Sequence, residues 1–459
     1  MQTPSDNPWS LDSWAARPNA QSISYPDPEA LTRAAQRLRT LPPLVTSWEI
    51  ERLKSLIADA QLGKRFLLQA GDCAETLADC TPHAITSRLK ILLQMSLVLV
   101  HGSRRPVIRV GRFAGQYAKP RSSPTESRNG LTLPSYYGDL INRSEFSPDA
   151  RTPDPALLLA GYHHAAMTLN FVRALVDGGF ADLHHPEYWD LAFLHNAALS
   201  PALRERYQQM SRELAHALRF MEALGETSIH ELNRVEFYTS HEGLNLHYES
   251  ALTRRVPRRE TYYNLSAHLP WIGDRTRQTD HAHIEFFRGV ANPIGIKLGP
   301  NATPSETLSL LKALNPSNEP GKIILITRLG APNVAQLLPP LIRAVRDAQS
   351  TVLWASDPMH GNTITTSTGL KTRSFDAVLA ELDATFDAHA SEGTLLGGAH
   401  VELTADDVTE CLGGAAAITE ADLHKNYASP TDPRLNYQQS MELSFRIADR
   451  MGDSPLPKT

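Results

Sequence analysis

The chain contains very little cysteine, with only Cys73, Cys80 and Cys411 among 459 residues. Such a sparse and odd set does not build a disulfide framework and is typical of a reducing compartment. The first 14 residues have no apolar core and predict no secretory leader, and the strongly apolar stretch 91–100 is too short to span a bilayer. We therefore expect a cytoplasmic protein that does not enter a membrane.

The chain also lacks an excess of positive charge. It carries 45 lysines and arginines against 50 aspartates and glutamates, which gives a net charge of -5. No overall basic field therefore indicates nucleic acid or a membrane surface as a partner. The 41% of hydrophobic residues is ordinary for a globular protein with a sizeable core, built as one large domain or two to three small ones.

Short apolar runs alternate with segments of helical pattern along most of the chain. The eight runs are 65–69, 106–110, 235–239, 262–266, 294–298, 323–327, 351–355 and 399–403. The helical patterns are 84–101, 156–176, 281–290, 304–314, 334–349, 375–389 and 437–451. This alternation predicts parallel strands joined by crossovers, and eight units favour an α/β fold of the closed (β/α)8 TIM-barrel type.

Two parts of the chain do not follow the alternation. Residues 1–60 predict an N-terminal arm with a helical extension, and residues 61–459 the catalytic barrel. Within the barrel, residues 177–232 form an insertion with a helical pattern at 201–224. An inserted helical pair can serve packing, an oligomer interface or regulation, and the pattern does not choose among them.

The apolar runs share a feature at their carboxyl ends, where a barrel of this type has its active site. Each run ends in, or leads to, a titratable or cationic residue: Cys73, Arg112, Glu242, Arg275, Lys297, Arg328, His360 and Glu402. Solubility alone does not explain eight such placements. The sequence therefore predicts an enzyme whose site lies at this end of the barrel.

One group of these residues is suited to a metal ion. It offers a thiolate, an imidazole and two carboxylates, from Cys73, His360, Glu402 and the segment 431–436. These donors suit a divalent transition metal better than Mg²⁺ or Ca²⁺. Their spacing in the sequence does not choose among the histidines, so His241 and His400 remain alternatives to His360.

A second group is cationic and consists of Arg112, Lys119, Arg121, Arg275, Lys297 and Arg328. Lys297 and Arg328 lie in or at the end of apolar strands, where an unpaired charge is costly, so ligand binding explains them better than a surface role. The loop 119–122 adds two cations and a hydroxyl that suit a phosphomonoester. A metal beside so much positive charge predicts a reaction of small phosphorylated metabolites.

Seven segments resemble the class II, plant and microbial type, 3-deoxy-D-arabino-heptulosonate 7-phosphate (DAHP) synthases. They are 69–75, 111–122, 239–242, 292–300, 357–363, 397–402 and 432–436, within a resemblance that runs from about residue 10 to residue 451. The resemblance implies condensation of phosphoenolpyruvate with D-erythrose 4-phosphate. That reaction is the first step of the shikimate pathway, which leads to chorismate and the aromatic amino acids.

The resemblance also implies roles for single residues. It assigns a divalent metal, commonly Mn²⁺ or Co²⁺, to Cys73, His360, Glu402 and Asp432, which selects His360 among the histidines. It assigns phosphoenolpyruvate to Arg112, Arg275, Lys297 and Arg328, and the erythrose 4-phosphate end to Lys119, Arg121 and Ser122, with Lys371 as a further site residue. The catalytic candidates are Lys297, Glu242 and Arg112, of which Lys297 or Glu242 is expected to transfer protons.

Other implications concern redox chemistry, regulation and assembly. Thr431 stands where the family often has a cysteine, so we expect no disulfide between this position and Cys73. The insertion 177–232 resembles the helical pair of feedback-regulated members, which implies aromatic amino acids as effectors. We expect a homo-oligomer, either a dimer or a tetramer.

Three alternatives to this function differ in what they require. A metal hydrolase on the same barrel needs no dense set of cations, so Lys297 and Arg328 argue against it. An inactive regulatory or scaffold paralogue should have lost at least one ligand, and none is missing. A synthase that uses another aldose phosphate remains open.

Overall fold

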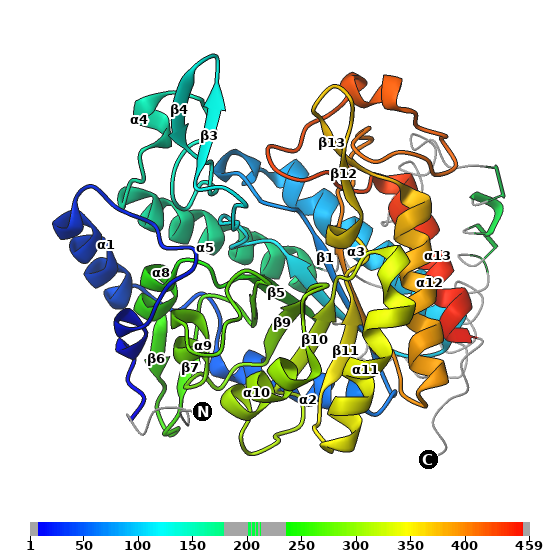
Figure 1. The fold of residues 1–459 in the computed structure, drawn as a ribbon, viewed down its shortest axis with the longest axis horizontal. Helices are drawn as coiled ribbons and strands as arrows, with labels where there is room; N and C mark the ends of the chain where they lie inside the picture. Colours follow the sequence, from blue (N-terminus) through cyan, green and yellow to red (C-terminus); the bar gives the residue numbers. More distant parts are fainter. Residues whose placement is uncertain are drawn as a thin grey trace.

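The computed structural model describes residues 8–178 and 236–452, together with 201, 202, 204–206, 208, 209 and 212. Its centre is a closed barrel of parallel strands in the order β1-β14-β11-β10-β9-β8-β5-β2 (Figure 1). The strands are β1 (Phe66–Gly71), β2 (Val107–Arg112), β5 (Phe237–Glu242), β8 (Leu269–Ile272), β9 (Ile294–Leu298), β10 (Ile323–Thr327), β11 (Leu353–Ser356) and β14 (Gly398–Glu402). The predicted (β/α)8 barrel is confirmed.

The fourth barrel strand differs from the one that the apolar runs predict. The run 262–266 contains Tyr262–Asn264 (β7), which pairs antiparallel with Thr253–Arg255 (β6) in a two-stranded sheet outside the barrel. The barrel strand is instead β8, which has four residues and contains Pro270. Because proline cannot donate a backbone hydrogen bond, it lowers the strand signal of this segment, whereas two tyrosines raise that of β7.

Each of the seven helical patterns corresponds to a helix. The helices are α3 (Pro82–Ser103), α5 (Ala156–Asp177), α9 (Ala282–Phe287), α10 (Pro304–Leu314), α11 (Val334–Asp347), α12 (Phe375–Ser391) and α13 (Tyr437–Gly452). Their starts follow local chemistry. Thr81 and Thr303 accept a hydrogen bond from the first turn of α3 and α10, and a proline stands directly after each.

Further elements surround this frame. They are α1 (Pro28–Thr40), α2 (Ser47–Gln61), α4 (Pro148–Arg151) and α8 (Leu246–Ala251), with the hairpins β3 (Thr125–Arg128) to β4 (Leu131–Pro134) and β12 (Thr363–Thr365) to β13 (Lys371–Arg373). Both hairpins stand at the top in Figure 1, beyond the carboxyl ends of the barrel strands. The described positions between 201 and 212 are helical, and the rest of the expected pair within 179–235 lies outside the described residues.

Helix α3 is the one described helix that is long and apolar enough to cross a membrane by length and composition. However, 67% of its most apolar window is buried inside the fold. It packs against α13 and β2, so its hydrophobicity is explained by its place in the core.

Helix α2 closes the end of the barrel that lies opposite the site. Its Leu53, Leu56, Ile57 and Ala60 form one buried cluster with side chains from six of the eight barrel strands. The helix begins at a capping box in which Thr46 and Glu49 satisfy each other's backbone N–H groups. The N-terminal extension therefore supplies the floor of the barrel interior.

The barrel interior changes from apolar to charged along the strands. Residues two or four apart in a strand share a face. Ile108, Ile324 and Leu353 belong to the buried interior cluster, and the residues four positions later are Arg112, Arg328 and Asp357. On these three strands, the inward face therefore has an apolar side chain near α2 and a charged side chain at the carboxyl end.

Candidate active site

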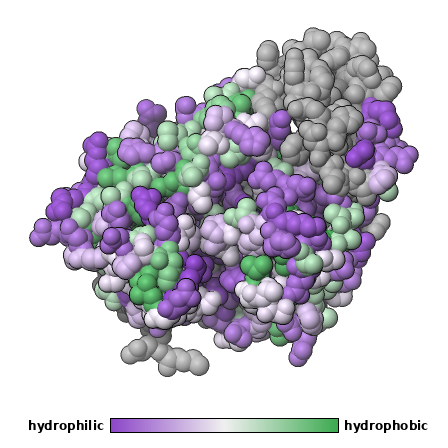
Figure 2. All heavy atoms as spheres, turned by 90° about the horizontal axis from the view of Figure 1, so that it is seen from above, coloured by the Kyte–Doolittle hydropathy of each residue, from purple (hydrophilic) through white to green (hydrophobic). Residues whose placement is uncertain are grey.

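All thirteen residues that the sequence predicts for the site line one cavity of about 300 Å³. They are Cys73, Arg112, Lys119, Arg121, Ser122, Glu242, Arg275, Lys297, Arg328, His360, Lys371, Glu402 and Asp432. The cavity lies at the carboxyl ends of the barrel strands. Seen from above, the molecule is largely hydrophilic and is hollowed near the middle of this face (Figure 2).

Three of the proposed metal ligands lie close together. One donor atom each from Cys73, Glu402 and Asp432 falls within 4.8 Å of the other two. His360 is outside this tight group, but its Nε2 lies 3.0 Å from Glu402 Oε1. Its Nδ1 lies 2.7 Å from Asp357 Oδ2, which fixes the ring through the nitrogen that faces away from Glu402.

The two alternative histidines do not line the cavity. His241 Nε2 lies 2.8 Å from Glu249 Oε1, on the outer side of β5. His400 is one inward position below Glu402, where its Nδ1 lies 2.8 Å from Gln69 Oε1. Burial, followed by the charges of Lys297 and Arg112, lowers the pKa of His400 well below its usual value.

The Cys73 thiol is fully buried at the bottom of the cavity. Burial, with help from Glu402, raises its pKa to about 11, although Lys119 acts in the opposite direction. Thr431 Oγ1 lies 2.9 Å from the sulfur, and all three cysteines are free. Cys73 therefore forms no disulfide with any residue that the structure describes, and this thiol would release its proton on binding a metal.

The cations of the cavity have acidic partners, which the sequence analysis did not identify. Lys297 contacts Asp357, Arg328 Nη1 lies 3.0 Å from Asp274 Oδ2, and Arg112 Nη2 lies 2.9 Å from Glu402 Oε1. Buried charges are retained only when they are paired in this way. Arg275 differs from these cations because it is exposed, and it forms no ion pair with any residue that the structure describes.

Burial shifts the pKa of both candidate proton carriers toward neutral pH. It lowers the pKa of Lys297 to about 8, with Arg112 acting in the same direction and Asp357 against it. It raises the pKa of the Glu242 carboxyl, although Lys297 and Lys119 act against this. Perturbed groups of this kind are typical of acid–base sites.

Several further residues shape the cavity without having been singled out from the sequence. Gln116 donates to the Cys73 carbonyl at 3.3 Å and accepts from the Glu242 N–H at 2.8 Å. Arg112 lies over the Trp271 ring, 5.1 Å from its centroid. The 111–122 segment contains Gln116, but no local pattern distinguishes it from an ordinary loop glutamine.

Arg373 is the buried cation that sequence reasoning missed most completely. Its Nη2 lies 2.8 Å from Glu402 Oε2, its Nε donates to Thr363 Oγ1 at 2.9 Å, and its Nη1 donates to the Pro433 carbonyl. It therefore joins segments that carry Glu402, His360 and Asp432. It comes from the short strand β13, outside the alternation of strands and helices, so the period of the sequence gives no sign of it.

The chain matches the model of the class-II DAHP synthetase family over residues 9–448. It belongs to this family. It is 49% identical over 463 residues to a phospho-2-dehydro-3-deoxyheptonate aldolase of Neurospora crassa, covering 97% of this chain and 95% of that protein. A protein of the same name from Streptomyces coelicolor is 48% identical over 447 residues, covering 97% and 98%.

A solved structure, the truncated form of 3-deoxy-D-arabino-heptulosonate 7-phosphate synthase from Thermotoga maritima, resembles this class-II family member more distantly. The likeness covers 83% of this chain and 84% of that chain at 13% identity, with a TM-score of 0.32. It is too weak to bear on the fold, which the strand pairing of this chain establishes directly.

Proposed function

We propose that this chain is a DAHP synthase, a transferase of the shikimate pathway. It condenses phosphoenolpyruvate with D-erythrose 4-phosphate and water to give DAHP and inorganic phosphate. Its family membership carries this proposal, because relatives at 48–49% identity cover nearly the whole chain. The cavity supports it, because it is lined by enough cations for two phosphates and a carboxylate and by a group of side chains that could hold a metal ion.

The residues present fit a divalent transition metal. A thiolate, an imidazole and two carboxylates, from Cys73, His360, Glu402 and Asp432, form a mixed sulfur, nitrogen and oxygen donor set. Mn²⁺ or Co²⁺ is the proposed ion. Bound there, it would polarise the aldehyde carbonyl of erythrose 4-phosphate as a Lewis acid.

The cations hold and orient the two substrates. Arg112, Arg275, Lys297 and Arg328 bind phosphoenolpyruvate, and Lys119, Arg121 and Ser122 bind the erythrose 4-phosphate end, with Lys371 at the rim. Guanidinium groups bind phosphate and carboxylate through paired hydrogen bonds. Arg275 carries no competing ion pair among the described residues and is free to meet a phosphate.

The reaction then follows from this arrangement. The enol carbon of phosphoenolpyruvate attacks the aldehyde carbon, and cationic character develops at the carbon that bears the phosphate. Water adds to that carbon, and the resulting hemiketal phosphate loses inorganic phosphate. Lys297 and Glu242 hold the protons that move in these steps, because both side chains line the cavity and have pKa values shifted toward neutrality.

A metal-stripped assay tests the reaction and the cofactor together. The chelated protein is mixed with both substrates, and Mn²⁺, Co²⁺, Zn²⁺ or Mg²⁺ is added back while enol loss and phosphate release are followed. We expect equal loss of the two substrates, restored by Mn²⁺ or Co²⁺. No turnover with any metal would favour an inactive paralogue or another aldose phosphate as acceptor.

Two substitutions test the ligand set. Cys73→Ala and His360→Ala should each lower turnover by more than ~100-fold while the fold survives. Cys80→Ala is the matched control, because Cys80 lies outside the cavity, where its sulfur lies 3.7 Å from the His164 carbonyl oxygen. Near-normal turnover in either ligand variant would exclude that residue as a metal ligand.

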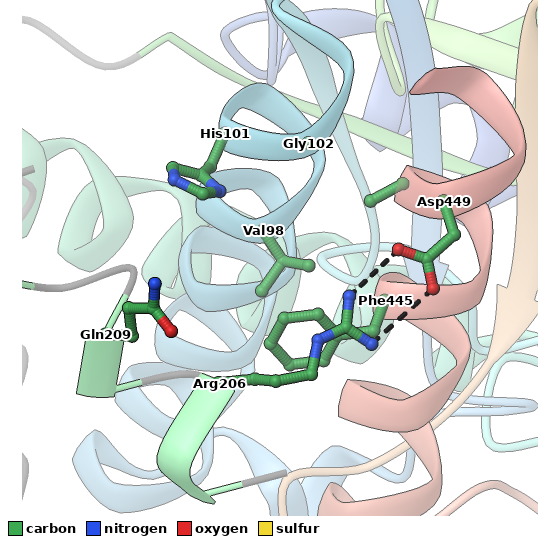
Figure 3. Close-up of a pocket in the computed structure, with 8 residues that line it drawn as sticks. Val98, His101, Gly102, Arg206, Gln209, Phe445 and Asp449 are labelled. Carbon is green, nitrogen blue, oxygen red and sulfur yellow. Dashed lines mark hydrogen bonds and ion pairs between the residues drawn. The ribbon is translucent and has the colours of Figure 1, made fainter. Parts of the chain in front are cut away.

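We further propose a cytoplasmic homo-oligomer that aromatic amino acids regulate. A second cavity, of about 170 Å³, lies between α3, Arg206 and α13 (Figure 3). Arg206 lies over the Phe445 ring at 4.4 Å, and its Nη2 is 2.8 Å from Asp449 Oδ1. An aromatic amino acid has a ring and a carboxylate, which are the two kinds of group that Arg206 already contacts in Phe445 and Asp449. The regulatory proposal fails if phenylalanine, tyrosine and tryptophan, alone and mixed, leave activity and thermal stability unchanged.

A further inference from the structure

A buried glutamate outside the cavity holds two neighbouring loops of the site. Glu381 projects from α12 and is 1% exposed. Its Oε1 accepts hydrogen bonds from the backbone N–H groups of Leu329 at 2.8 Å and Gly330 at 3.1 Å. Its Oε2 accepts one from Asn362 Nδ2 at 2.7 Å. One carboxylate thus meets the loop after β10 and the loop after β11.

These two loops carry site residues of different kinds. Leu329 follows Arg328, a proposed phosphoenolpyruvate ligand, and Asn362 comes two residues after His360, a proposed metal ligand. The loops also bond to each other, because Arg328 Nη2 donates to the His360 carbonyl at 3.2 Å. A Cβ atom at Gly361 would lie 2.3 Å from the Gly330 nitrogen, so the two backbones touch.

We propose that Glu381 is a positioning residue that fixes Arg328 and His360 relative to each other. We call its three hydrogen bonds to the two loops the Glu381 clamp. It touches neither substrate nor metal, and it does not line the cavity. It acts through the backbone of one loop and the Asn362 side chain of the other. The roles of Arg328 in binding phosphoenolpyruvate and of His360 in binding the metal rest on the proposed function, whereas the clamp itself rests on the contacts of Glu381.

The chemistry of the clamp makes the carboxylate hard to replace. Three donors face Glu381 and each needs an acceptor, because a buried donor left without one is unfavourable. A glutamine of equal size turns an NH₂ group toward the backbone N–H groups or toward Asn362. The asparagine cannot turn to compensate, because its Nδ2 also donates to the Pro358 carbonyl at 2.8 Å and its Oδ1 accepts from Ala331 at 3.1 Å.

A second buried glutamate offers a matched control on another loop. Glu75 is 2% exposed and accepts the backbone N–H groups of Ala114, Gly115 and Gln116 at 3.0, 3.1 and 3.0 Å. The loop that it holds follows β2 and leads to Lys119 and Arg121, on the proposed erythrose 4-phosphate side. Both carboxylates therefore accept backbone N–H groups of a loop, and the two loops lie on different sides of the cavity.

The test compares Glu381→Gln with Glu75→Gln in the full chain. The Mn²⁺ dissociation constant is measured by chelator competition without substrates, followed by the KM for each substrate and the unfolding temperature. We expect Glu381→Gln to weaken Mn²⁺ binding roughly tenfold, at the low end of what loss of a ligand's own hydrogen-bond partner gives, because Glu381 reaches His360 only through Asn362. It should also raise the KM for phosphoenolpyruvate roughly tenfold and leave that for erythrose 4-phosphate nearly unchanged. Glu75→Gln should instead raise the KM for erythrose 4-phosphate.

Two outcomes would overturn the proposal. In one, Glu381→Gln lowers the unfolding temperature but leaves Mn²⁺ binding and the KM for phosphoenolpyruvate within twofold of the wild type. In the other, Glu75→Gln raises the KM for phosphoenolpyruvate as much as Glu381→Gln does, which would indicate general loosening. Asn362→Ala tests the same clamp from its other end if Glu381→Gln does not fold. Because Mn²⁺ binding is measured without turnover, failure of the proposed reaction would be recognised separately.

Discussion

Lys119 Nζ lies 2.5 Å from Asp432 Oδ2 at the bottom of the cavity. The same ammonium contacts Cys73 Sγ and lies 3.4 Å from Glu402 Oε1. Burial alone would lower the pKa of Lys119, but Asp432, Cys73 and Glu402 outweigh it and raise the pKa above its usual value. One side-chain cation thus faces the three grouped donors, and it would compete with a metal ion bound there for the same negative charge.

Removal of the Lys119 cation should strengthen the binding of the metal ion and weaken the binding of erythrose 4-phosphate. We expect Lys119→Met to bind Mn²⁺ at least ~10-fold more tightly, because three donors lose their competing charge, and to raise the KM for erythrose 4-phosphate. Chelator competition and steady-state kinetics measure the two effects. Lys371→Met is the control, because Lys371 pairs with Asp432 at 2.7 Å but its side chain is 41% exposed, so its effect on the metal should be smaller. Weaker Mn²⁺ binding in Lys119→Met would contradict the competition.

The pH dependence of phosphoenolpyruvate capture should report Lys297. Burial, followed by Arg112, lowers the pKa of this lysine to about 8, so it is protonated below that pH and loses its charge as the pH rises through it. Since the bound ligand is an anion, kcat/KM for phosphoenolpyruvate should fall above about pH 8. Lys297→Arg should lack this fall, because a guanidinium stays charged. A wild-type profile that is flat from pH 7 to 9 would exclude Lys297 as the titrating group.

The floor of the barrel should matter for stability and not for substrate binding. Ile57 is fully buried, in the cluster that α2 forms with the barrel strands, far along the strands from the cavity. Ile57→Ala should cost about 2–5 kcal/mol of unfolding free energy, measured by urea denaturation, with both KM values near those of the wild type. Leu62→Ala, at the exposed end of the same helix with 58% of the residue accessible, should change stability by less than about 0.5 kcal/mol. Equal losses in the two variants would mean that α2 does not serve as the floor.

The stability of the segments that carry the proposed metal ligands should depend on Arg373. Its fully buried guanidinium has Glu402, Thr363 and Pro433 as partners, so Arg373→Met leaves the Glu402 carboxylate buried with one cation fewer. We expect a lower unfolding temperature in the chelated protein, and a loss that added Mn²⁺ partly restores, because the ion replaces the missing charge. Differential scanning calorimetry with and without the metal measures this. An unfolding temperature equal to that of the wild type in chelator would contradict the role.

The sequence by itself determined the repeating elements and the residues that reach the site. The helix 304–314 and the strands 294–298 and 323–327 are the ones that the patterns predict, because capping residues and short, mainly apolar runs are local signals. The thirteen site residues follow from where those runs end and from the resemblance of the segments around them. Both are properties of short stretches of chain, which do not depend on how the barrel closes.

Tertiary structure alone decided which of these groups meet. The strand 269–272 belongs to the barrel despite Pro270, because its neighbours bury it and supply its partners. Asp274 and Asp357 neutralise cations from other strands, and Glu381 joins two loops that its own helix does not contain. Contacts of this kind depend on strand register and barrel closure. They bring together residues that lie tens to hundreds of positions apart, and no local pattern of apolar and polar residues encodes that pairing.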